Sequence, residues 1–148
     1  MLIDSLKTLF NRDLHKLKTE IESYQNESNI WKTPEGITNS AGNLCLHLIG
    51  NSNTYIGAEF GKTGYVRNRA LEFSLKNIPR TDLVSKIEET IFIVNTALDN
   101  ISEKDLKMEF PILVFEKKTS TEFMLIHLTT HLAYHLGQIN YHRRLIDN

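Results

Sequence analysis

The stretch "HLTTHLAYHLGQINYHRRL", residues 127–145, carries four of the six histidines of the chain. Its apolar residues recur at helical spacing, so the stretch predicts one long helix. His127, His131 and His135 follow one another at intervals of four, and histidine frequency alone gives such a triple about 0.01 times in a chain of this composition. Residues four apart lie about 40° apart around a helix and about 6 Å apart along it. Two imidazoles can therefore point at one position, as in a metal site, although a helix that carries histidines for packing is the alternative.

Other amphipathic segments precede this one, and together they predict an all-α fold. Thr119 followed by Glu122 matches a capping box at the start of the last helix, and Thr81 is expected to cap the one before it. The predicted helices span residues 2–25, 40–60, 81–101 and 119–146.

Four such helices in a chain of 148 residues predict a four-helix bundle that forms a single domain over residues 1–148. Residues 102–118, with a short β-prone run around Pro111, predict a small hairpin or an ordered loop before the last helix. We expect the core to include one residue from each helix, namely Leu17, Leu48, Ile91 and Phe123.

Composition excludes several classes of protein. Lys plus Arg number 17 and Asp plus Glu number 18, which argues against a specific nucleic-acid-binding surface. No run of 18 apolar residues is present, and the charged residues near Met1 interrupt any signal peptide, so we expect no membrane partner. Cys45 is the single cysteine, so no disulfide forms within the chain, and a cytoplasmic location is expected.

The segment 61–80 is locally basic, with Lys62, Arg67, Arg69, Lys76 and Arg80 against a single acid, Glu72. It is expected to contain a short helix. Arg67 or Arg69 could hold an anionic substrate or cofactor, and the alternative is a solvated surface on which they pair with Glu72.

A metal needs more than two ligands, and His47 is the candidate third because it lies on the apolar face of the second predicted helix. By itself His47 is more simply interpreted as a hydrogen-bonded core residue. Together with the histidine pair on the last helix, however, the interpretation as a metal ligand is favoured. His127 is expected to support a ligand or to lie in the core, His142 to be a cation at the helix end, and His15 to be a surface residue. Cys45 should face away from His47 and pack in the core.

Two motifs together resemble the DinB-like superfamily, which includes the YfiT-type metal-dependent proteins and the bacillithiol transferases. These are "LCLHLIGNSNTYIG" (residues 44–57) and the histidine stretch with its "HLGQI" ending. The resemblance spans essentially the whole chain, and "VRNRALEFSLKNIPR" (residues 66–80) resembles one uncharacterised branch.

The resemblance implies a bundle with up-down-down-up connectivity, a homodimer, and a divalent metal, zinc or nickel, held by His47, His131 and His135. Gln138 is a candidate to support one of these ligands. The implied activity is transfer of a low-molecular-weight thiol to a small-molecule electrophile, with metal-dependent hydrolysis or a non-catalytic metal-binding bundle as alternatives. Many relatives carry a glutamate and an arginine where this chain has Leu132 and Leu136. Because that glutamate could act as general base, its absence makes hydrolase activity a weaker prediction. It does not affect the prediction of a bound metal.

Overall fold

A computed structural model describes all 148 residues, and its regular secondary structure is helical throughout, as predicted. Four long helices account for most of it, and short helices lie in the connections between them. In chain order the elements are α1 (Leu2–Ser23), the 3₁₀ turn η1 (Glu27–Trp31), α2 (Ala41–Ser52), the π-helical η2 (Asn53–Ala58), α3 (Glu59–Gly61), α4 (Arg69–Ser74), α5 (Arg80–Asp99), α6 (Glu103–Leu106) and α7 (Thr121–Ile146).

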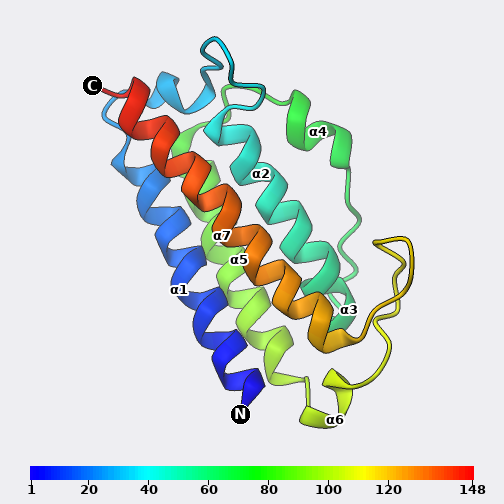
Figure 1. Cartoon of the computed structure of the whole chain (residues 1–148). Coiled ribbons are helices and arrows are strands. Elements are labelled where there is room, and N and C mark those ends of the chain that lie inside the picture. The colour runs from blue at the N-terminus through cyan, green and yellow to red at the C-terminus, as the bar shows by residue number, and fades with distance from the viewer.

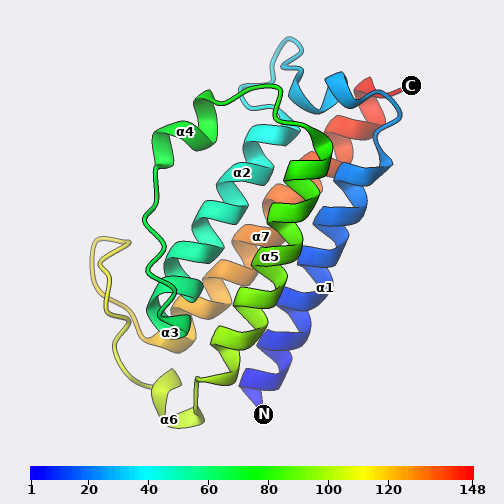
Figure 2. The same cartoon turned by 180° about the vertical axis from the view of Figure 1, so that it is seen from behind.

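The long helices α1, α2, α5 and α7 lie side by side (Figures 1 and 2), with α1 packed on α5 and α7, and α2 packed on the same two helices. The colours of Figure 1 show that α1 and α7 run in one direction and that α2 and α5 run in the other. One cluster of 29 buried apolar residues fills the space between them. No helix is both long enough and apolar enough to cross a membrane.

Three of the four predicted core residues, Leu17, Leu48 and Ile91, are buried in this cluster. The prediction for Phe123 is wrong, because 53% of its surface is exposed. It lies in the first turn of α7 and its ring contacts Phe115 of the preceding loop, with the centroids 5.9 Å apart. Its helical face therefore looks onto that loop and not into the core.

The predicted helix boundaries shift slightly. Ser40 caps α2, and the helix continues through η2 and α3 to Gly61, close to the predicted end. At α7 the cap is Ser120, whose hydroxyl accepts a hydrogen bond from the Phe123 N–H at 3.1 Å, one residue after the predicted cap Thr119. The helix α5 begins one residue before the predicted cap Thr81, directly after Pro79.

The connection before α7 is an ordered loop and not a hairpin of two strands. A single antiparallel bridge between Glu109 and Ser120 closes it. The predicted short helix in the basic segment is present as α4, which packs on α2 beside the histidines.

The structure gives His142 a role that the sequence did not predict. This residue is buried, and its ring joins two elements: Nδ1 accepts a hydrogen bond from the Tyr24 hydroxyl at 2.6 Å, and Nε2 donates to the Lys32 carbonyl at 2.8 Å. Both partners come from the segment that follows α1 and folds back over the end of α7. With both nitrogens hydrogen-bonded, His142 is a buried structural residue that joins these segments.

Candidate metal centre

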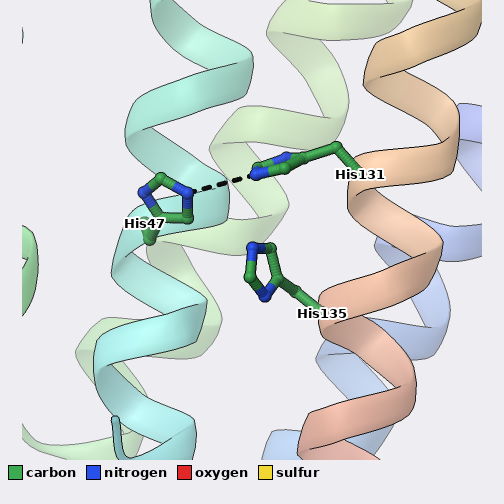
Figure 3. A group of neighbouring side chains, drawn as sticks. All are labelled: His47, His131 and His135. Carbon is green, nitrogen blue, oxygen red and sulfur yellow. Dashed lines mark hydrogen bonds between the residues drawn. The ribbon is translucent and has the colours of Figure 1, made fainter. Parts of the chain in front are cut away.

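Three histidines, one from α2 and two from α7, converge in the structure. One side-chain nitrogen from each of His47, His131 and His135 lies within 4.8 Å of the other two. His131 and His135 share one face of α7 because they are one helical turn apart, and His47 faces them from α2 across the helix contact (Figure 3). The structure thus brings together the three residues that the sequence singles out as candidate ligands.

The spacing of the imidazoles fits a common ion. His47 Nε2 and His131 Nε2 are 3.2 Å apart, and this contact is the dashed line in Figure 3. Two nitrogens that bind one zinc tetrahedrally at about 2.0–2.1 Å each lie about 3.3 Å apart. The His135 ring centroid is 4.6 Å from that of His131 and 5.3 Å from that of His47, so the third ligand is within reach.

Electrostatics keep two of the imidazoles neutral. Burial and the neighbouring histidines His135, His47 and His127 lower the pKa of His131 to about 4. Burial also lowers the pKa of His47, against the opposing effect of its hydrogen bond to Glu72. Neutral rings keep the lone pair that a metal requires, so these ligands need not lose a proton at neutral pH before they bind one.

Two of the three rings are held by hydrogen bonds on the side away from the cluster. His135 Nδ1 donates to Gln138 Oε1 at 2.7 Å, which is the contact expected for Gln138. His47 Nδ1 lies 3.0 Å from Glu72 Oε1. His131 Nδ1 is buried with no hydrogen-bond partner, so no hydrogen bond holds that ring from the side away from the cluster.

Glu72 is the site residue that sequence reasoning did not assign to this centre. It is buried, and Arg67 binds it with two hydrogen bonds, Nε to Oε2 at 2.8 Å and Nη2 to Oε1 at 2.9 Å. The pairing of Arg67 with Glu72 was foreseen, but as a solvated surface pair. The one available signal was Glu72 itself, the single acid within the basic segment 61–80.

The other candidates lie outside the cluster. Arg69 stacks over the Phe73 ring, with its guanidinium carbon 5.4 Å from the ring centroid, and forms no contact with the triad. His127 packs edge-on against Phe115, and its ring centroid is 6.1 Å from that of His131. His15 is exposed and Cys45 is buried as a free thiol, as expected. Of the two candidate arginines, only Arg67 therefore reaches the site.

A pocket of about 750 Å³ adjoins the cluster on the side of His135 and Gln138. Its walls are the 34–39 loop, one face of α7 and Leu44 of α2. Glu35 is the only acidic residue that lines the pocket, and no Lys or Arg lines it. The apolar residues and tyrosines of the pocket are Pro34, Ile37, Leu44, Tyr134, Tyr141, Leu145 and Ile146. Such a volume is within the usual range of small-molecule sites.

Known protein families include a match for this chain. A family model described as "Protein of unknown function (DUF1572)" matches residues 2–148. No curated protein and no solved structure matches the chain.

Proposed function

Because the chain belongs to the DUF1572 family, whose description names no function, we propose a function from the site: His47, His131 and His135 bind one divalent metal, zinc or nickel, in a DinB-like four-helix bundle. The observation that carries the proposal is the convergence of three imidazole nitrogens within 4.8 Å. The directions of the long helices agree with the up-down-down-up connectivity that the DinB-like resemblance implies.

We further propose that the protein is an enzyme that transfers a low-molecular-weight thiol to a small electrophile. Three protein ligands leave coordination positions free, and a divalent metal in such a site can bind a thiol and favour its ionised form. The residues of this chain would hold and orient the two reactants. Through the metal, the three histidines would fix the position at which the thiol sulfur binds, and the adjoining pocket would receive the electrophile.

Transfer is favoured over hydrolysis by the state of the one carboxylate that is hydrogen-bonded to the triad. Glu72 accepts two hydrogen bonds from Arg67 and one from His47, on the side of the His47 ring away from His131. It is therefore not free to accept a proton from a water molecule. A thiolate needs no such base, so thiol transfer fits these residues better.

The test begins with metal analysis of protein purified without an affinity tag. Cysteine and 1-chloro-2,4-dinitrobenzene are then added, and release of chloride on formation of the carbon–sulfur bond is followed. We expect about one metal per chain, and turnover that requires both metal and thiol and is lost in His131→Ala but retained in the surface control His15→Ala. Metal without turnover would favour a non-catalytic metal-binding bundle, and absence of metal would contradict the whole proposal.

A further inference from the structure

We propose that Glu72, held by Arg67, is a positioning residue: it fixes the His47 ring so that Nε2, free of its proton, faces His131 and His135. This inference rests on the proposed metal site and extends it to the segment between α3 and α5. It assigns a role to a buried glutamate that the triad by itself leaves unexplained.

The hydrogen bonds determine which nitrogen of His47 carries the proton. Arg67 donates one hydrogen bond to each oxygen of the Glu72 carboxylate, so this carboxylate acts as an acceptor. His47 Nδ1, 3.0 Å from Glu72 Oε1, must then be the donor. Arg67 Nη2 is also 3.3 Å from Nδ1, but both groups are donors there, and the carboxylate between them accepts from each. The Nε2 atom is thereby left as the unprotonated nitrogen that a metal requires.

The helix α2 is shaped to receive this carboxylate. Gly50 lies almost one turn after His47, and a Cβ added there would be 1.9 Å from Glu72 Oε2. Any other residue at position 50 would therefore displace the carboxylate. Asn43, just over one turn before His47, anchors α4 by donating to the carbonyls of Glu72 and Leu75, both at 2.9 Å. The contacts before and after His47 thus hold Glu72 against its ring.

A second Arg–Glu pair in the same molecule provides a matched control. Arg143 Nε donates to Glu20 Oε2 at 2.7 Å and joins α7 to α1, with the glutamate side chain only 15% exposed. No histidine takes part in this pair. Loss of Glu20 therefore measures what a partly buried Arg–Glu pair contributes to the fold without any effect on a ligand.

The first experiment is a zinc titration of the full chain in competition with a chromogenic chelator. Glu72→Gln keeps the size of the side chain but removes its charge, and we expect it to weaken zinc affinity about 10- to 100-fold. Glu20→Gln should bind zinc as the wild type does. If Glu72→Gln melts at a lower temperature yet binds zinc with wild-type affinity, Glu72 is only a latch between α4 and α2 and the inference is overturned.

Gly50→Ala tests the same point with Arg67, Glu72 and His47 all present. Since the new methyl group occupies the space of the carboxylate, zinc affinity should fall by a similar factor. Gly137→Ala is the matched control, because a Cβ at this helical glycine meets no atom within 4 Å. Equal zinc affinity in Gly50→Ala and Gly137→Ala would contradict the positioning role.

A readout without metal separates this inference from the proposed function. Nitrogen-15 NMR of the metal-free protein should show the His47 proton on Nδ1 in the wild type and a mixture of tautomers in Glu72→Ala. A wild-type proton on Nε2 overturns the inference. If the wild type binds neither zinc nor nickel, the proposed function is overturned, and the His47 tautomer then decides the role of Glu72 by itself.

Discussion

At the scale of single residues, histidines on one helix differ because their surroundings differ. On α7, His131 faces His47, His127 packs against Phe115, and His142 is bonded to Tyr24. All of them recur along the helix at intervals of whole turns, so the spacing in the sequence does not distinguish a candidate ligand from a structural histidine. The partner across the helix contact therefore decides whether an imidazole is a candidate ligand or a structural residue.

The first prediction separates the ligands from their neighbour on α7. His47→Ala should lose the metal while the helices stay folded, because the ring contributes to the site and the 29 buried apolar residues still hold the helices together. His127→Ala should keep the metal, since its nitrogens are not among the converging set. Metal content per chain, measured by mass spectrometry for both variants and the wild type, checks this. Loss of metal from His127→Ala would mean that a different pair on α7 binds it.

The second prediction concerns acid. The pKa of His131 is about 4 in the folded protein and about 6.5 when unfolded. Between these values the unfolded chain binds more protons than the folded one, so the free energy of unfolding should fall as pH decreases from 6.5 to 4. Urea unfolding of metal-free protein at several pH values measures this slope. His131→Gln should flatten it, and an unchanged slope in that variant would contradict the lowered pKa.

At the scale of elements, the molecule is held together where connections fold back on the long helices. The segment from Tyr24 to Lys32, which contains the turn η1, covers the end of α7, because both of these residues form hydrogen bonds with His142. Within η1, Trp31 is buried against Gly42 of α2. The helix α4 is fastened to α2 by Asn43 and by Glu72. These short segments therefore determine which side chains surround His142 on α7 and His47 on α2.

The third prediction tests the link between the end of α1 and α7. Tyr24→Phe removes the hydroxyl that donates to His142 Nδ1 and leaves this buried nitrogen without a partner. An unsatisfied buried polar group costs about 1–3 kcal/mol, so the free energy of unfolding should fall by that amount. Tyr134→Phe is the control because its side chain is exposed. Equal unfolding midpoints in urea for the two variants would mean that the bond does not stabilise the fold.

At the scale of the whole molecule, the apolar core holds the fold, and the candidate metal centre is less buried than that core. The 29 buried apolar residues form one cluster, whereas His131 and His135 are only half-buried. Burial of so many large side chains is sufficient to hold a chain of this length in a single fold. We therefore expect the fold to be retained when the histidine site is empty.

The fourth prediction follows from this difference between the apolar core and the candidate metal centre. Removal of the metal with a chelator should leave the helical circular dichroism spectrum unchanged, because the apolar core stays intact. The melting temperature should fall only by the amount that ligand binding to the folded state contributes. Spectra and thermal melts before and after chelation measure both quantities. Loss of the helical signal on chelation would identify the site as a structural one on which folding depends.

The fifth prediction is that DNA binding is weak and without sequence preference. Basic and acidic residues number 17 and 18, so the chain has no overall positive field to attract phosphates. Fluorescence anisotropy with labelled duplexes at physiological salt measures this affinity. Tight, sequence-specific binding would contradict the prediction.

The sequence by itself pointed to the helices and to all three candidate ligands. Helix formation and the meeting of residues four apart depend on local periodicity, which can be read from the chain, so α7 and the His131–His135 pair were predictable. His47 followed from its place on an apolar face, because that face had to point at the other helices. The boundaries erred by one or two residues at helix ends, where neighbouring polar groups compete to cap the same helix.

Only the tertiary structure decided which distant groups meet. Glu72 reaches His47 across 25 residues of sequence, and Tyr24 reaches His142 across 118. Phe123 has the spacing of a core residue but faces the loop before α7. These contacts depend on how irregular segments fold back over helices, and no periodic pattern encodes that path. The same charged residues that read as a solvated surface thus became the buried support of a histidine, because α4 packs against α2 and excludes water from between them.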